Sequence, residues 1–187
     1  MKDLGRTKFC LGLQIEYLNK HQEAYITKVL KKFYMDKSHS LCTPMVVRSL
    51  DVDKDPFRPQ EKDEELLGPE VPYLSAIEAL MYLAYYTRLD IAFAVNLLAR
   101  YSSSPTRRHC STIKHILCYL KDIMNMGLFY PNDSKSYLMC YPDADYLPDS
   151  HNGKSGRGYL FTCNGITISW RYVKQTITAI SPNHAKI

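Results

Sequence analysis

The chain of 187 residues lacks the patterns that mark secreted, zinc-binding and membrane proteins. Its six cysteines form no Cys-x-x-Cys pair, and its Cys and His residues do not stand at zinc-finger separations, which favours free thiols. Residues 1–5 contain no apolar segment of a signal peptide. The apolar stretch from Ala79 to Ala99 is interrupted by Arg88, Asp90 and Asn96, which argues against a bilayer span. We therefore expect an intracellular chain, cytoplasmic or nuclear, with no membrane partner.

Charge is distributed unevenly along the chain. The net charge is +5, but residues 51–70 carry eight acids and three bases, so the remaining residues carry +10. A basic body suits a polyanionic partner, although many proteins with neutral ligands are also mildly basic. The apolar fraction of 45%, with 15 Tyr and 6 Phe, is sufficient for a packed core.

The first 72 residues predict a strand, a helix and a long connection. The alternating segment KFCLGLQIEYLN (residues 8–19) is typical of a strand, and His21-Gln22 of a turn. The segment AYITKVLKKFYM has apolar residues at helical spacing, which predicts a helix ending near Met35. Residues 50–72 hold four of the ten prolines and most of the excess acid, so we expect a linker or long loop there.

Three further helices are predicted, the first ending at Thr87, the second spanning 91–100 and the third ending near Ile123. Their expected start signals are Ser75, Asp90 and the pair Ser104-Pro105. In the third helix an apolar stripe is predicted to be buried, formed by Cys110, Ile113, Leu117 and Leu120.

The opposite side of that third helix is basic. Arg107, Lys114 and Lys121 are spaced seven residues apart, with Arg108 and His115 beside them. Such a ridge is suited to gripping a phosphate backbone, and it is equally typical of an ordinary solvated helix face. The pattern alone leaves both interpretations open.

After a turn at residues 131–133 the pattern changes to strands. The segments SYLMCYPDA, GRGYLFTCNG and ITISWRYV are short, aromatic and β-branched, and Asn164-Gly165 is a strong hairpin signal. We expect the opening three strands of a sheet, with an unpaired edge.

The segments FCLGLQIEY, YITKVLKKFYM, CTPM, YLSAIEALMYLAYYTRLDIAFAVNLLARYSSSPTRRHC and YPDADY occur in the order seen in Pol polyproteins of copia-type retrotransposons, which the chain resembles. The resemblance implies an α+β fold: a strand-helix segment and a three-helix thumb-like region, then an incomplete ribonuclease H-like sheet. It divides the chain into a reverse transcriptase palm/thumb segment (1–48), an acidic linker (49–72), thumb and connection helices (73–128) and a truncated ribonuclease H-like domain (134–187).

The resemblance also interprets the segment CYPDADYLPD, which looks at first like the Tyr-x-Asp-Asp hairpin of a polymerase. It places that hairpin upstream of Met1 and places YPDADY at the end of the first ribonuclease H strand. Asp143 is then implied as a ligand of the two Mg²⁺ ions of the parent family, and Asp145 as a turn residue.

Several residues depart from the family pattern. His184 and Lys186 stand where the resemblance expects glutamates, and a lysine would put a cation at a metal site. Pro142 stands beside Asp143 in an expected central strand, where it removes a ladder hydrogen bond. We therefore expect an incomplete metal site, no cofactor for this chain and no catalysis of its own.

Two alternative functions remain. The first is a module that binds an RNA–DNA hybrid or other nucleic acid. Its candidate residues are Arg107, Arg108, Lys114, Lys121 and Lys174. The second is a subunit that another polypeptide completes in trans for RNA-directed DNA synthesis or hybrid hydrolysis.

Overall fold

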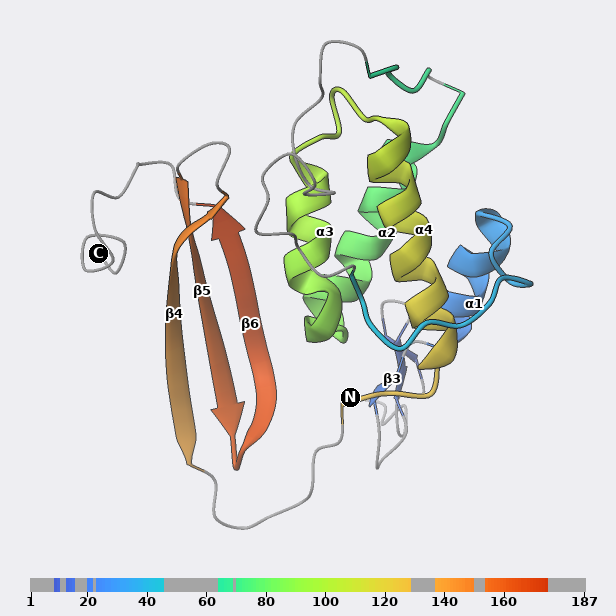
Figure 1. Cartoon of the computed structure of the whole chain (residues 1–187). Helices are drawn as coiled ribbons and strands as arrows, with labels where there is room; N and C mark the ends of the chain where they lie inside the picture. Colours follow the sequence, from blue (N-terminus) through green and yellow to red (C-terminus); the bar gives the residue numbers. More distant parts are fainter. Residues whose placement is uncertain are drawn as a thin grey trace, which may run out of the picture.

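The structure, a computed structural model, describes residues 9–10, 13–15, 20–21, 23–45, 64–68, 70–128, 137–149 and 154–174. These residues form a mixed helix and sheet fold, as the predicted α+β class requires (Figure 1). Four α-helices pack around a common core, and an antiparallel sheet of β4, β5 and β6 lies beside them. A second, smaller sheet of β1, β2 and β3 lies near the N-terminus.

The smaller sheet corrects the prediction of one long first strand. β1 (Phe9–Cys10) pairs antiparallel with β2 (Leu13–Ile15), which pairs in turn with β3 (Lys20–His21). His21 therefore belongs to a strand, and its assignment to a turn is wrong.

Helix α1 (Glu23–Lys32) ends three residues before the predicted Met35. Tyr34 takes a left-handed conformation with φ of 57°, which stops the helix. The N–H of Met35 donates to Leu30 O at 2.8 Å and the N–H of Tyr34 donates to Lys31 O at 3.2 Å. This pair of hydrogen bonds is a Schellman motif, in which the left-handed residue is usually glycine.

The next two helices begin at other residues than predicted. Helix α2 (Tyr73–Tyr86) starts after Pro72 instead of being capped by Ser75. A 3₁₀ turn, η2 (Leu89–Ile91), precedes α3 (Ala92–Ala99), so Asp90 is not the cap of this helix. The predicted end of α2 at Thr87 is confirmed, since Thr87 is its C-cap residue.

Helix α4 (Arg107–Asp122) is capped by Thr106, which corrects the prediction of Ser104 and Pro105. Thr106 and His109 form a capping box, and the Thr106 N–H donates to His109 Nδ1 at 3.2 Å. Histidine takes the place of the usual Glu or Gln, which is why the sequence pattern gave no signal. The predicted end near Ile123 is confirmed, because Ile123 is the C-cap residue.

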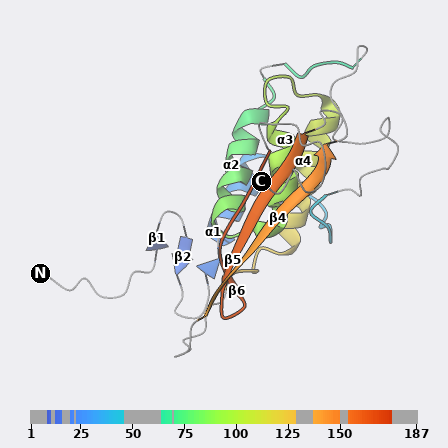
Figure 2. The same ribbon diagram turned by 90° about the vertical axis from the view of Figure 1, so that its left-hand side faces the viewer.

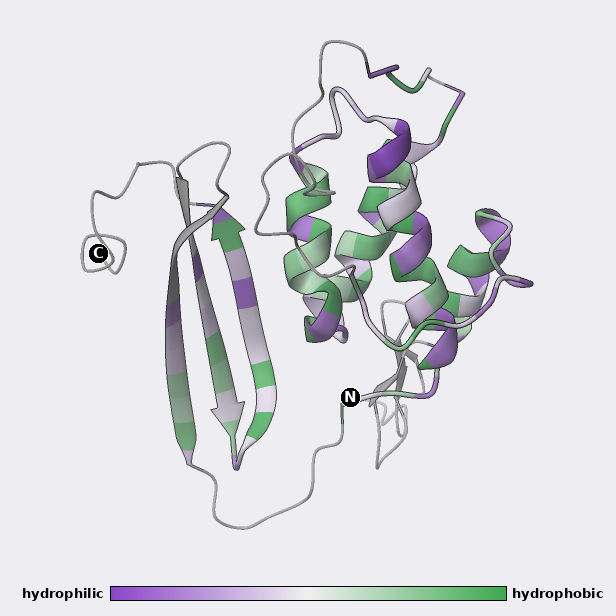
Figure 3. Cartoon of the chain, viewed as in Figure 1, coloured by the Kyte–Doolittle hydropathy of each residue, from purple (hydrophilic) through white to green (hydrophobic). Residues whose placement is uncertain are grey.

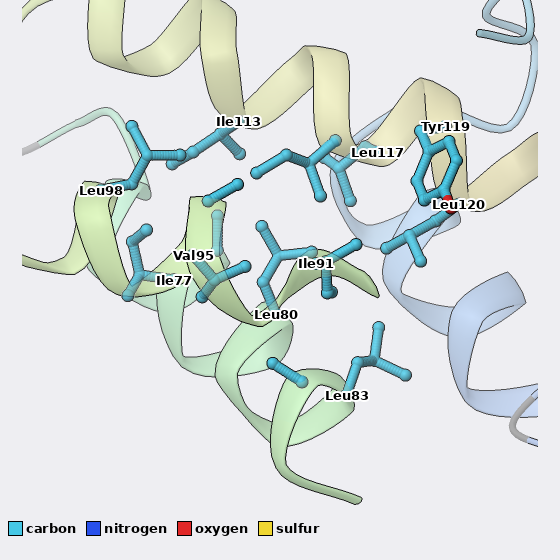
Figure 4. Close-up of a cluster of buried hydrophobic side chains, with 14 of the residues drawn as sticks. Ile77, Leu80, Leu83, Ile91, Val95, Leu98, Ile113, Leu117, Tyr119 and Leu120 are labelled. Atoms are coloured by element: carbon cyan, nitrogen blue, oxygen red, sulfur yellow. The ribbon is translucent and has the colours of Figure 1, made fainter. Parts of the chain in front are cut away.

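The core lies between the four helices (Figure 4). Ile113, Leu117 and Leu120 of α4 are buried as predicted and point toward α2 and α3, whereas Cys110 is only partly buried. Ile77 and Leu80 of α2 face them, with 2% and 0% exposure. Figure 3 shows the alternation of hydrophobic and hydrophilic residues along α4 that this one-sided burial requires.

The three predicted C-terminal strands are confirmed as β4 (Leu138–Asp149), β5 (Lys154–Cys163) and β6 (Ile166–Lys174), in the order β4-β5-β6. The predicted hairpin is also confirmed, because Asn164 and Gly165 both have positive φ, 52° and 78°, as a type I′ turn requires. Among the described strands β4 lies at the edge, so the prediction that Pro142 lies in a central strand is wrong. An edge strand tolerates proline because it pairs on one side only.

The sheet is attached to the helices through β6, which packs against α3 (Figures 1 and 2). The indole N–H of Trp170 donates to Ala84 O at the end of α2 at 2.7 Å, and Trp170 is 8% exposed. The rings of Phe93 and Tyr172 meet edge to face with centroids 5.2 Å apart. These contacts place the sheet on the side of α3 that faces away from α4.

Candidate nucleic-acid interface

Helix α4 presents a basic surface opposite its buried side. Its 16 residues include four Lys or Arg, and Asp122 in the last turn is its only acid. Arg107 and Lys114 are both exposed. Within the described part of the chain, neither side chain forms an ion pair. Both charges are therefore available to a phosphate group.

The other predicted cations of α4 are engaged inside the protein. Arg108 forms an ion pair with Glu64 at 2.8 Å, with side chains 17% and 23% exposed. Lys121 donates a hydrogen bond to the backbone carbonyl of Ser38. These contacts hold residues 64–68 and the chain after α1 against α4, so Arg108 and Lys121 have structural roles.

Residues 64–68, part of the predicted linker, therefore pack against the four helices. Leu66 forms a β-bridge with Thr106, and the N–H of Leu67 donates to Pro105 O at 2.9 Å. His115 extends the same pattern on the other side, with Nε2 3.0 Å from Thr43 O. Residues 51–63 lie outside the described residues.

A groove of about 380 Å³ opens between the end of α1, the start of α2 and α4. Three cations line it, Lys32, Arg107 and Lys114, and its described lining contains no acidic residue. The walls are apolar and include Phe33 and the buried Tyr73. We call this feature the α1–α4 groove.

Tyr73 stays neutral in the wall of the α1–α4 groove. Its hydroxyl donates to Leu98 O at 2.9 Å, and burial raises the pKa of this phenol far above its usual range. Lys32 lies across the groove, where its Nζ is 2.5 Å from Ser75 Oγ and 5.3 Å from the centroid of the Phe33 ring. The groove thus combines an apolar wall with a positive rim.

Lys32 and Tyr34 are residues of this groove that the sequence interpretation missed. The only signal is the basic end of α1, Lys31 and Lys32, which is also common in helices with no ligand. Lys32 lines the same groove as Arg107 of α4, which is about 75 residues further along the chain, so the sequence does not show that they lie together. Lys174 belongs to β6 on the other side of α3, so the structure does not bring it to α4 (Figure 1).

Asp143 is exposed on β4, at the rim of a second cavity of about 370 Å³ between the sheet and α3. It pairs with Gly158 of β5, and a Cβ on that glycine would lie 3.9 Å from Asp143 Cβ. Arg171 also lines this cavity, whose described lining holds no second carboxylate. Across the described residues, no group of three or more His, Cys, Asp or Glu is placed to hold a metal ion.

Other predicted site residues fall outside this cavity. Asp145 lies in β4 and pairs with Gly156 of β5, so its prediction as a turn residue is wrong. His184 and Lys186 lie outside the described residues. The cysteines whose side chains are described, at positions 42, 110, 118, 140 and 163, are free thiols. None of the described helices is both long and apolar enough to cross a membrane.

The whole chain is similar to long polyproteins of plant transposons. It is 36% identical over 192 residues to the retrovirus-related Pol polyprotein from transposon TNT 1-94 of Nicotiana tabacum, an alignment that covers 100% of this chain and 14% of that polyprotein. It is 30% identical over 179 residues to the corresponding polyprotein from transposon RE1 of Arabidopsis thaliana, covering 94% of this chain and 12% of the relative. The chain therefore spans a small part of these relatives.

A much shorter relative matches part of this chain. The secreted RxLR effector protein 161 of Plasmopara viticola is 41% identical over 111 residues, which cover 59% of this chain and 78% of that protein. No family model and no solved structure matches the chain. The full-length similarity to transposon polyproteins shows that the chain belongs to the family of retrovirus-related Pol polyproteins of copia-type retrotransposons.

Proposed function

We propose that this chain is the thumb and connection region of a copia-type Pol polyprotein with the start of a ribonuclease H-like domain, and that it binds nucleic acid without catalysis of its own. Residues 1–48 and 73–128 form the palm/thumb segment and the helices, joined by the linker at 49–72. Residues 134–187 contain the ribonuclease H-like strands. RNA–DNA hybrid is the proposed ligand, because it is the substrate that such a region would hold.

The observation that carries this proposal is the positive surface shared by α1 and α4. Lys32, Arg107 and Lys114 line one groove that has no acidic residue in its described lining. Phosphates are the commonest polyanionic partner of such a surface, and each contact releases a counterion from the nucleic acid. Arg108 and Lys121 hold neighbouring segments in place and support this surface indirectly.

The residues around Asp143 are the reason that we propose no catalysis by this chain. Two-metal hydrolysis needs several carboxylates around a pair of Mg²⁺ ions. The described residues at the cavity beside Asp143 contribute this one carboxylate and the cation Arg171, which repels a metal ion. These residues do not fit a two-metal site, and we derive no hydrolytic step from them.

Fluorescence anisotropy with a labelled RNA–DNA hybrid, at roughly 50 to 200 mM salt, tests the binding proposal. Arg107→Gln/Lys114→Gln removes two exposed charges and should lower the slope of log K against log salt by about 2. The matched control is Arg157→Gln/Arg171→Gln, which removes two exposed charges from the sheet. An equal loss in both double variants, or no loss in the first, would contradict binding on α4.

A second function is supported by the edge strand β4, which pairs only with β5 among the described strands. An open edge can accept a strand from another polypeptide, and such a partner would supply the missing carboxylates beside Asp143. A reconstituted mixture with the remaining Pol segments tests this function. Its hybrid-hydrolysing activity should disappear with Asp143→Asn, and activity that survives this substitution would rule the function out.

A further inference from the structure

The α1–α4 groove has the size and lining of a site for a small amphipathic anion. Its volume of about 380 Å³ lies within the range of roughly 300 to 1,000 Å³ that is usual for ligand pockets. Its wall is formed by apolar side chains of three helices, and its rim carries positive charge. A ligand that fits both features has a flat or apolar body and a negatively charged group.

Tyr34 at the mouth of the groove is a second, independent feature. It has φ of 57° at a Schellman position that favours glycine, so its side chain is accommodated at a conformational cost. The side chain is also 90% exposed, so the ring gains almost nothing from packing inside the protein. A strained, exposed aromatic ring has no stabilising role in the fold, which points to a ligand that covers it.

The charges on the rim select a polyanion. Lys32 is held close to the Phe33 ring by its contact with Ser75, and Arg107 and Lys114 stand on α4 opposite. An exposed aromatic ring beside a row of cations is the combination by which proteins bind single-stranded nucleic acid, because a base stacks on the ring and the backbone follows the charges. A paired base is stacked within its duplex and cannot enter such a groove.

We infer that the α1–α4 groove holds an unpaired nucleotide, whose base lies on Tyr34 and enters the apolar groove while its phosphates contact Arg107 and Lys114. The inference rests on the proposed nucleic-acid binding by α4 and adds a strand preference to it. The chain should accordingly bind a hybrid with a single-stranded overhang more tightly than a blunt hybrid.

The variant Tyr34→Gly tests the role of the Tyr34 ring in binding separately from its effect on the stability of the fold. Glycine relieves the left-handed strain, so this variant should melt at the same temperature as the wild type or higher. Its affinity for an oligothymidylate of roughly 10 nucleotides should fall on the order of tenfold, the contribution of one base–aromatic stack. Its affinity for a blunt RNA–DNA hybrid should fall much less, because a blunt duplex offers no unpaired base to the ring. Tyr85→Ala, which removes a 44% exposed tyrosine from α2, is the matched control and should change neither affinity.

The outcomes distinguish this inference from the proposed function. Unchanged affinity of Tyr34→Gly for the single strand, or an equal loss for single strand and blunt hybrid, overturns the inference and leaves binding by α4 intact. Failure of the wild-type chain to bind any of the probes overturns both. Photocrosslinking of an oligonucleotide that contains 5-iodouracil gives a direct readout: attachment at Tyr34 or Phe33 supports the inference, and attachment only outside the groove contradicts it.

Discussion

Replacing Asp90 should destabilise the fold more than any other single surface-accessible carboxylate in the helical unit. Its two oxygens accept hydrogen bonds from Arg88 at 3.0 and 2.6 Å, and one of them also accepts from the Tyr119 hydroxyl at 2.7 Å. Arg88 is 3% exposed and donates to Ile123 O at 3.2 Å, so it joins the start of η2 to the end of α4. Asp90 neutralises this buried guanidinium.

The expected cost follows from these contacts. Breaking a buried ion pair by removing one partner costs about 3 to 5 kcal/mol, because the remaining charge is left uncompensated. The side chain of Asp90 is 33% exposed, so water can partly solvate Arg88 when the carboxylate is removed. The expected loss of unfolding free energy in Asp90→Ala is therefore near the lower limit, about 3 kcal/mol. For a chain of this size the melting temperature should fall by about 6 to 12 °C.

The dependence on pH gives a second readout. Burial disfavours the ionised form of Asp90, but the hydrogen bonds and charge of Arg88 outweigh it and hold the pKa of Asp90 below its usual value. The stabilisation is therefore complete above the ordinary pKa of an aspartate, about 4, and is lost as the pH falls through the lower pKa of the folded state. The difference between wild type and Asp90→Ala should accordingly shrink only below about pH 4.

Tyr119 reports on the same network at alkaline pH. Burial and its hydrogen bond to Asp90 raise the pKa of Tyr119 to about 12. Its contribution is complete below the usual tyrosine pKa of about 10 and is lost as the pH rises through about 12. In Asp90→Ala this tyrosine should ionise at a lower pH. Ultraviolet absorbance of tyrosinate measures this change, and the difference from a Tyr119→Phe variant isolates the signal of Tyr119.

Urea unfolding followed by circular dichroism at pH 7 provides the main assay, with a double-mutant cycle on Arg88 and Asp90. Replacing both by apolar residues, Arg88→Met/Asp90→Leu, removes the buried charge together with its partner and should cost less than the sum of the single changes. A neutral Asp90→Ala, or a double variant whose cost equals that sum, would refute the assignment of this network as a stabilising ion pair.

Two further changes test the other connections of the helices. Trp170→Phe removes the hydrogen bond to Ala84 and should lower the free energy of unfolding by about 1 to 2 kcal/mol in urea, with an unchanged stability contradicting the role of this contact. Thr106→Ala removes one half of the capping box with His109 and should cost about 1 kcal/mol in the same assay, whereas Thr106→Ser, which keeps the hydroxyl, should cost much less.

The sequence predicts the helices and strands well where the signal is local. The hairpin at Asn164-Gly165 needs two positive φ angles, and that requirement is visible in two adjacent residues. Helix starts were predicted less well, because several residues able to cap a helix stand close together. The carboxylate of Asp90 is of the correct type for a cap, but the buried Arg88 and Tyr119 use its oxygens instead.

The candidate site was predicted only in part. The spacing of Arg107 and Lys114 places both on one face of α4, which the structure shows to be exposed. Spacing does not reveal that Glu64 pairs with Arg108 or that Ser38 accepts a hydrogen bond from Lys121, because these partners lie 44 and 83 residues away. Long-range packing thus divides one sequence pattern into residues that stay exposed, Arg107 and Lys114, and residues that hold neighbouring segments, Arg108 and Lys121.

Helix α3 separates the α1–α4 groove from the cavity beside Asp143, so the two candidate sites can be considered independently. Arg107 and Lys114 line the groove between α1, α2 and α4, whereas Asp143 lies on the sheet. The sheet contacts the helices through β6, which packs against α3. Changes at distant sites without shared partners usually contribute independently. The α4 surface therefore does not depend on whether Asp143 ever meets a metal ion. The proposed binding by the helices can therefore be tested separately from any role of Asp143.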